Sequence, residues 1–222
     1  MGGDGREEID VLVIAPVFDV PSALSYEAAC RLLNWCGEYG FSARGLLGPA
    51  ANWLALWAVL RQARPVLVSY WDHGMPGYLY SGWPPFPLIT VENVRVLRGV
   101  RAFHTMACHS AERLGRAAVE RAGVGAFYGA EDLLLAFFPA PERNYAEDWI
   151  DMMLTVPTTL LRRLRADGEL TEDAFLEAFH AYAAKCWRYL SLYEEHLGDW
   201  PNADWHYHAC LTNLLNYELI LP

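Results

Sequence analysis

Two segments of the sequence place a reactive side chain at the end of an apolar run. Residues 66–71 lead into Asp72, His73 and Gly74, and residues 100–107 lead into Cys108. A free thiol has a pKa near 8.5 and is only about 3% ionised at pH 7, so a nucleophilic cysteine needs a partner that takes its proton. An imidazole is the usual partner. His73 and Cys108 are therefore the candidate base and nucleophile.

The elements that must position this pair alternate between strand and helix patterns up to about residue 130. Apolar, largely β-branched runs predict buried strands at 9–15, 66–71 and 100–107, with further strands at 41–47 and 124–128. Helices are expected from Ser22, which can act as the cap, to residue 39, and at 50–62 and 110–122. This alternation predicts a three-layer α/β/α fold with a mostly parallel central sheet.

The rest of the chain follows other patterns. Residues 75–90, rich in Gly, Pro and aromatics, predict an irregular loop between the candidate base and nucleophile. Residues 144–196 read as helical, with Pro157 expected to kink or split the first helix and Thr171 to cap the second. The tail, 197–222, is expected to return to the sheet edge or to form a last helix. We expect one domain over 1–222: an α/β core (1–140) and a mainly helical C-terminal portion (141–222) packed on it.

Ligands of parallel α/β sheets bind beyond the carboxyl ends of the strands. His73 and Cys108 both follow such ends. If their strands are neighbours, their backbones lie only about 4.8 Å apart, so an imidazole and a thiol can approach each other. Gly74 allows close approach of a substrate, and its amide together with that of Cys108 could hold a developing oxyanion.

These motifs resemble those of a known group of enzymes. The strand ending in SYWDHG, the next ending in MACHSA, the Leu-Gly in the helix that follows and the AGVGAFYGA segment are similar to those of the clan CD cysteine peptidases, which include caspases, gingipains, separases and CHAT domains. The resemblance covers about residues 9–132. It implies a caspase-hemoglobinase fold and a thiol protease without a cofactor. His73 would be the general base or ion-pair partner, Cys108 the nucleophile and Gly74 an oxyanion donor.

The same resemblance implies a deep S1 pocket that selects the residue before the scissile bond. Acidic residues in comparable places are Asp19 in the first loop and Glu131 and Asp132 after the fifth strand. An acidic pocket would select Arg or Lys through a desolvated charge pair. The expected activity is therefore an endopeptidase that cleaves protein or peptide substrates after a basic residue. The segment after Asp132 matches no subgroup of the family, which leaves its role and a regulatory protein partner open.

Other readings of the same residues compete with this one. A Cys-His pair at a strand-to-helix elbow also occurs in PfpI-type class I amidotransferase-like hydrolases, whose elbow reads Ala-x-Cys-His-Gly. Here Ser110 replaces their glycine, and SYWDHG lacks their Gly-Gly. A degenerate caspase-like domain could act as a catalytically silent regulator or scaffold. Cys108 alone would most simply be a buried packing residue. His109, next to the candidate nucleophile, could share the role of His73.

Composition excludes several further classes. The formal net charge of −10 argues against nucleic-acid binding, because phosphate contacts need clustered Lys and Arg. The five cysteines form no CxxC pair, and no apolar run reaches the length of a membrane span. The N-terminus, MGGDGREEID, lacks the pattern of a secretory signal, so a cytoplasmic location is expected. A metal is not expected; Asp204, His206 and His208 could share one strand face, but the segment reads more simply as an aromatic docking segment.

Overall fold

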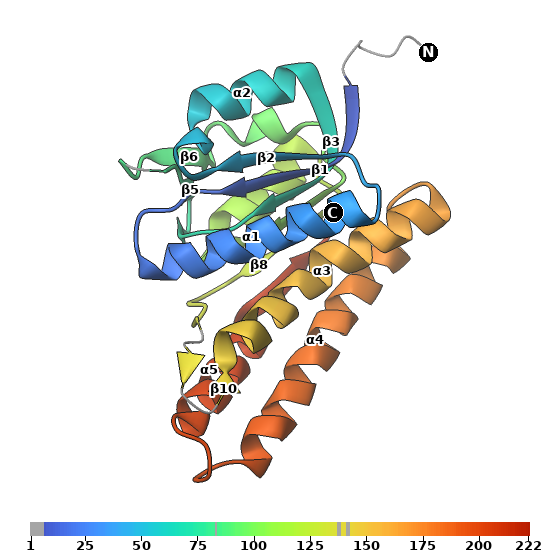
Figure 1. Cartoon of the computed structure of the whole chain (residues 1–222). Coiled ribbons are helices and arrows are strands. Elements are labelled where there is room, and N and C mark those ends of the chain that lie inside the picture. Colours follow the sequence, from blue (N-terminus) through green and yellow to red (C-terminus); the bar gives the residue numbers. More distant parts are fainter. Residues whose placement is uncertain (1–6, 83, 137–138, 141–142) are drawn as a thin grey trace.

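A six-stranded sheet forms the centre of the molecule in a computed structural model, which describes residues 7–82, 84–136, 139–140 and 143–222 (Figure 1). Most of the acidic N-terminal segment, residues 1–6, lies outside the described residues. The strand order is β11-β8-β7-β3-β1-β2. The strands are β1 (Glu7–Ala15), β2 (Ala43–Leu47), β3 (Ala63–Tyr70), β7 (Ala102–Thr105), β8 (Ala126–Ala130) and β11 (Tyr217–Ile220). All neighbours pair in parallel except β11 with β8. The predicted mostly parallel sheet is confirmed.

Helices cover both faces of this sheet because successive residues of its strands point to opposite sides. Val11 and Val13 of β1 belong to one hydrophobic cluster, and Leu12 and Ile14 belong to the other. The first cluster includes side chains of α1 (Val20–Glu38), α3 (Tyr145–Asp167), α4 (Glu172–Glu195) and α5 (Ala203–Asn216). The second includes α2 (Trp53–Gln62) and the helical segments Ala111–Gly115 and Ala118–Ala122. Figure 1 shows α2 on one side of the strands, with α1 and α3 on the other. Three layers result.

Helix α1 begins earlier than its sequence predicts. Its cap is Asp19, whose carboxylate accepts the Ser22 amide at 2.8 Å, while the Ser22 hydroxyl accepts the Asp19 amide at 2.9 Å. The predicted cap, Ser22, is thus the third helical residue of a reciprocal capping box. Pro21 fits within the first turn, where an amide hydrogen has no helical partner. The start of the helix consequently fixes Asp19 in place.

The predicted irregular loop at 75–90 contains a small antiparallel sheet instead. Its strands are β4 (Gly74–Met75), β5 (Tyr78–Tyr80) and β6 (Pro87–Thr90). Leu79, Leu88 and Ile89 are fully buried in the second hydrophobic cluster. Burial of these three side chains holds the segment in an ordered three-stranded sheet, although it contains two Gly and four Pro.

The C-terminal portion differs from the expectation at Pro157, where α3 continues without a break. The hydroxyls of Thr155 and Thr158 bond back to helix carbonyls, and the buried Leu160 and Leu161 hold the second half of the helix against the core. Packing on both sides of the proline therefore outweighs the lost hydrogen bond.

The tail forms both predicted features, a last helix (α5) and an edge strand (β11). A short hairpin, β9 (Pro139–Ala140) and β10 (Arg143–Asn144), precedes α3.

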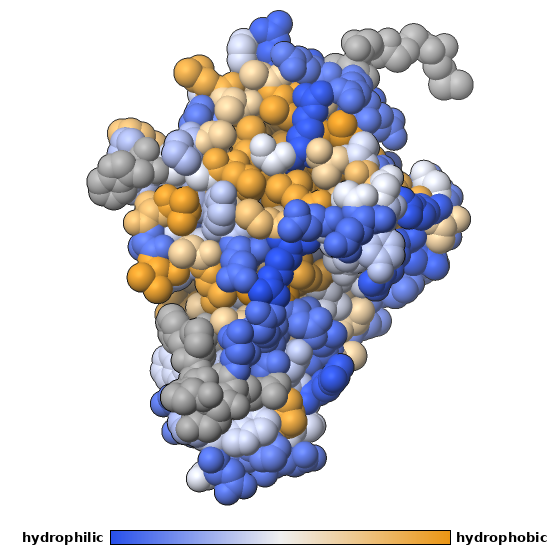
Figure 2. Space-filling model, viewed as in Figure 1, coloured by the Kyte–Doolittle hydropathy of each residue, from blue (hydrophilic) through white to orange (hydrophobic). Residues whose placement is uncertain are grey.

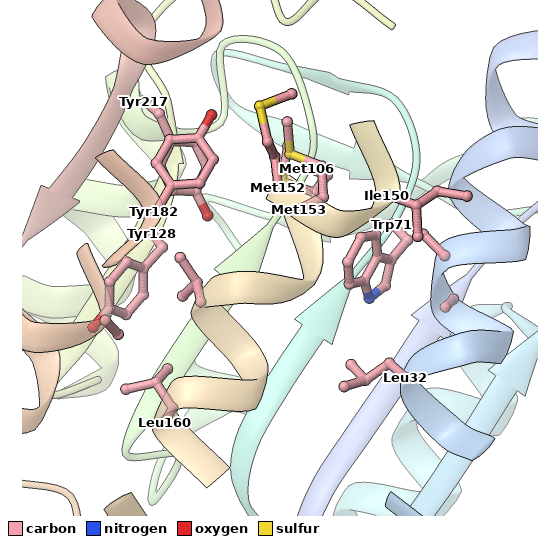
Figure 3. Close-up of a cluster of buried hydrophobic side chains, with 14 of the residues drawn as sticks. Leu32, Trp71, Met106, Tyr128, Ile150, Met152, Met153, Leu160, Tyr182 and Tyr217 are labelled. Atoms are coloured by element: carbon pink, nitrogen blue, oxygen red, sulfur yellow. The ribbon is translucent and has the colours of Figure 1, made fainter. Parts of the chain in front are cut away.

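Two buried side chains anchor the segments that carry the candidate residues. Trp71 precedes the Asp72-His73 pair and is fully buried; Figure 3 shows it near Leu32 of α1 and Ile150 of α3. Met106, just beyond β7, lies in the same cluster with Met152 and Met153 (Figure 3). The side chains that follow both strands are thus held by the core.

The molecular surface changes character along its length. Figure 2 shows apolar side chains gathered around the sheet and hydrophilic side chains over the part formed by α3, α4 and α5. Among the described residues, no helix combines the length and the apolar character needed to cross a membrane.

Candidate active site

The sheet brings His73 and Cys108 to neighbouring strand ends. β3 and β7 pair in parallel with Tyr70 opposite Thr105. His73 lies three positions after Tyr70, and Cys108 lies three positions after Thr105. Gly74 packs directly on the second segment: a Cβ atom there would lie 2.8 Å from the Ala107 Cβ and 2.9 Å from the Cys108 carbonyl oxygen. Such distances are too short for any side chain. Glycine is therefore required where the two segments meet.

His73 is oriented by a carboxylate. Its Nε2 atom lies 2.9 Å from Oδ2 of Asp19, and its ring packs beside Phe18 with a centroid separation of 5.4 Å. Partial burial opposes ionisation of Asp19, but hydrogen bonds from Ser22 and the nearby imidazole hold the pKa of this carboxyl below its usual value. An ionised carboxylate only accepts, so it places a proton on Nε2. Nδ1 is then the nitrogen left to receive a proton from a thiol.

The thiol of Cys108 meets the backbone of a neighbouring loop. Its sulfur accepts the Leu134 amide at 3.3 Å and lies 3.8 Å from the Leu134 carbonyl oxygen. No hydrogen bond joins it to His73 within the described part of the chain. Burial raises the pKa of the thiol, although the Leu134 amide works in the opposite direction. The thiol is thus partly covered and harder to ionise than a free cysteine, and catalytic hydrogen bonds often tighten only when substrate binds.

Helix α5 holds the loop over the thiol. The amide side chain of Asn213, which is fully buried, accepts the Leu135 amide at 2.7 Å and donates to the Leu135 carbonyl at 2.8 Å. The side chain of Asn216 donates to the Leu133 carbonyl at 2.8 Å. We call this pair of asparagines the Asn clamp. It fixes the backbone that contacts Cys108.

A pocket of about 240 Å³ opens beside the thiol and the imidazole. Its walls come from the start of α1, the two strand ends, the clamped loop, α3 and α5. The lining residues are Pro21, Ser22, Ser25, Asp72, His73, Met106, Cys108, Leu134, Leu135, Ala136, Trp149 and Trp205. Two indoles from the helical portion, Trp149 and Trp205, thus complete a pocket that begins on the sheet. No local pattern in the sequence connects them to the strand ends.

The three acidic residues expected in the S1 pocket lie elsewhere. Asp19 faces His73, as described above. Glu131 lies 3.7 Å from Arg116 on the neighbouring helical segment. Asp132 is about two-thirds exposed, and its carboxylate accepts the amide of Leu133. None of these side chains lines the described pocket.

His109 is not among the residues that line this pocket. Its backbone has a positive φ of 55°, and its Nδ1 lies 2.6 Å from a Glu112 carboxylate oxygen. The expected strand with Asp204, His206 and His208 is part of helix α5 instead, where His206 stacks on Tyr145 at 3.7 Å. In the described part of the chain no three His, Cys, Asp or Glu side chains are grouped to hold a metal ion.

Asp72 is the acidic side chain that does line the pocket. It is 3% exposed; one carboxylate oxygen accepts the His73 amide at 2.7 Å, and the other, Oδ2, is buried with no hydrogen-bond partner among the described residues. Burial raises the pKa of this carboxyl to about 8; the His73 amide lowers it and Asp19 raises it further. Asp72 was not among the acidic site residues predicted from the sequence, although its position directly after a buried strand and before His73 could have identified it.

We expect the Asp72 carboxyl to make stability depend on pH. In the unfolded chain it loses its proton near pH 4, but in the folded protein it keeps the proton to about pH 8. The folded state therefore binds more protons between these values, and this contribution to the free energy of unfolding falls as the pH rises. The stability of Asp72→Asn relative to the wild type should therefore rise by about 3–4 kcal/mol between pH 5 and pH 8, because Asn does not titrate.

Urea unfolding of both proteins at pH 5 and pH 8 measures this difference. The charged or titratable groups that act on the carboxyl are His73, Asp19 and Tyr70, and all three remain in the variant. A stability difference that does not change with pH would contradict an elevated pKa of Asp72.

The comparison with known proteins bears on this geometry. No protein-family model matches the chain, and no curated protein matches its sequence. Among solved structures, the chain is similar to the crystal structure of the Arg-specific cysteine proteinase gingipain R, with a TM-score of 0.56 and 13% sequence identity. The match covers 79% of this chain and 42% of the gingipain R chain. The architecture is thus similar to the caspase-hemoglobinase-like fold of gingipain R, and this chain spans less than half the length of its structural neighbour.

Proposed function

We propose that the protein is a cysteine endopeptidase that hydrolyses protein or peptide substrates after a basic residue. The observation that carries the proposal is the junction of the two strand ends, where Gly74 packs on the Cys108 backbone and His73 lines the same pocket as the thiol. The carboxylate of Asp19, which is partly exposed and lies 2.9 Å from the imidazole, adds the third part of a nucleophile, base and orienting group. The fold shared with an Arg-specific cysteine proteinase supports it.

In the proposed reaction, Nδ1 of His73 takes the proton of Cys108, and the thiolate attacks the carbonyl carbon of the scissile bond. The amides of Gly74 and Cys108 donate to the oxyanion that forms. Collapse of this intermediate breaks the C–N bond, and the imidazolium returns its proton to the leaving amine. Water, deprotonated by the same imidazole, then hydrolyses the thioester and releases the carboxylic acid and the free thiol.

The backbone favours this proposal over an amidotransferase-like hydrolase. A nucleophile elbow places the nucleophile itself on a sharp, strained turn. Here the left-handed conformation belongs to His109, and Cys108 is not among the described non-glycine residues with positive φ. The strained residue is held by its amide, which donates to the Asp132 carbonyl at 3.0 Å. The strained backbone conformation therefore lies at His109 and not at Cys108, unlike in a nucleophile elbow.

The rate of Cys108 alkylation tests whether the imidazole activates the thiol. We expect iodoacetamide to modify Cys108 at least about tenfold faster in the wild type than in His73→Ala at pH 7, because a paired imidazolium raises the thiolate fraction. Mass spectrometry of the peptides that contain Cys108 and Cys30 separates the two sites. The rate at Cys30, a partly exposed cysteine of α1, serves as the internal control and should not change.

Equal and slow alkylation of Cys108 in the two proteins would overturn the His-Cys pair. It would leave the silent regulator as the better reading of the fold. Cleavage of a peptide library by the wild type, lost in His73→Ala, would support the peptidase independently of any particular substrate.

A further inference from the structure

We infer that Asp72 is the residue that selects a basic side chain at the position before the scissile bond (P1), with Trp149 and Trp205 as the walls that hold the aliphatic stem of that side chain. The inference rests on the proposed peptidase function and assigns its substrate preference to a residue outside the three acids expected from the sequence.

The carboxyl group of Asp72 has an unused oxygen in a buried position. Oδ1 accepts the amide of His73, whereas Oδ2 finds no partner among the described residues, although its side chain is fully buried. Leaving a buried acceptor unpaired is costly, and leaving a buried charge unpaired costs more. Such a group is stabilised either by a proton or by a cation brought to the pocket. A substrate side chain is the cation that the pocket is open to receive.

The pocket supplies no permanent counter-ion of its own. Among the described lining residues there is no Lys or Arg, and the one group that can become cationic is His73, whose Nε2 lies 3.8 Å from Oδ1 of Asp72. That imidazole already pairs with Asp19 at 2.9 Å. Two carboxyl groups thus share one imidazole. An ammonium or guanidinium group that enters the pocket would allow Asp72 to ionise and would pair with its carboxylate.

The other walls suit the rest of a long basic side chain. Trp149 of α3 and Trp205 of α5 line the pocket, and indole faces attract cations while they also pack against methylene groups. The volume of about 240 Å³ is smaller than the roughly 300–1,000 Å³ typical of pockets for drug-sized ligands. It matches one side chain rather than an extended ligand. Arg and Lys combine a terminal charge with an apolar stem of this kind.

Paired peptide substrates test the assignment. Fluorogenic peptides that differ only in Arg or citrulline at P1 have nearly the same shape but differ in charge. We expect the wild type to prefer Arg by about 100-fold in kcat/KM, and Asp72→Asn to lower this ratio at least about tenfold. Asn keeps an oxygen for the His73 amide, and the ratio of the two peptides is the readout because it cancels any change in overall activity that the variant causes.

A matched variant controls for the loss of one negative charge. Asp173→Asn removes the same charge from an exposed position in the first turn of α4 and should leave the ratio unchanged. An unchanged ratio in Asp72→Asn, or a wild-type preference for citrulline, would overturn the inference. Cleavage of a P1 library after acidic or neutral residues would overturn it as well, together with the basic preference of the proposed function, while the peptidase activity itself would stand.

Protection of the thiol gives a readout that needs neither a variant nor turnover. Agmatine carries a guanidinium on a four-carbon stem, and pentylurea is a neutral analogue of similar shape. We expect agmatine to slow alkylation of Cys108 in the wild type, and pentylurea to leave the rate unchanged. Equal effects of both compounds would overturn the role of Asp72. Failure of the peptidase function is seen separately, as Cys108 alkylation that does not depend on His73.

Discussion

Cys108→Ala should lower kcat/KM for a peptide with basic P1 by a factor of about 10⁴ or more, because no other group in the pocket can form the thioester. Residual hydrolysis is expected from the oxyanion donors and from substrate binding alone. The fold should survive, since alanine removes one partly buried sulfur whose described partners are the backbone groups of Leu134. Steady-state cleavage and thermal unfolding of both proteins measure the two effects.

Cys30→Ala provides the matched control for this variant. Cys30 lies on α1 and is also a partly buried free cysteine, but it does not line the pocket. Its replacement should leave cleavage unchanged. Activity that persists in Cys108→Ala, or disappears in Cys30→Ala, would show that the nucleophile lies elsewhere.

Asp19→Asn should produce the second largest loss, about 10²–10⁴ in kcat/KM, with little change in stability. Asn caps helices nearly as well as Asp, so its oxygen can still accept the Ser22 amide. Its NH₂ group, however, can donate to Nε2 of His73. The ring would then carry its proton on Nδ1, where it cannot accept the proton of Cys108. Asp19 is therefore a positioning residue.

The pH profile separates this role from a purely structural one. A tautomer held by Asp19 predicts that Asp19→Asn loses the pH dependence of Cys108 alkylation, whereas a structural role predicts only a lower melting temperature. Asp19→Ala should combine the catalytic loss with about 1 kcal/mol of lost cap stability. Full activity of Asp19→Asn would remove the carboxylate from the mechanism.

Much of the α/β core could be predicted from local patterns. The β-branched runs of β1 and β3 are buried on both faces, and continuous apolar sequence is the signature of such strands. The meeting of the His73 and Cys108 segments followed from a general property of parallel sheets rather than from either motif alone. Those two predictions needed no knowledge of long-range contacts.

The parts that sequence patterns missed depend on distant partners. The small sheet of β4, β5 and β6 is ordered by burial of Leu79, Leu88 and Ile89. This burial outweighs the turn-like composition of the segment. Pro157 stays within α3 because tertiary packing holds both halves of the helix. The walls of the pocket and the Asn clamp come from α3 and α5, and no spacing in the sequence connects them to Cys108. Acidic loop residues were candidates for S1 because charge is visible in a sequence, whereas pocket geometry is not.

The Asn clamp also has a consequence for biosynthesis. The ribosome makes the chain from its N-terminus, so His73 and Cys108 emerge long before Asn213 and Trp205, which hold the loop and complete the pocket. The edge strand β11 follows later still. A nascent chain therefore carries both reactive groups without the walls that would hold a substrate. Order of synthesis alone delays assembly of the complete pocket until most of the chain has been made.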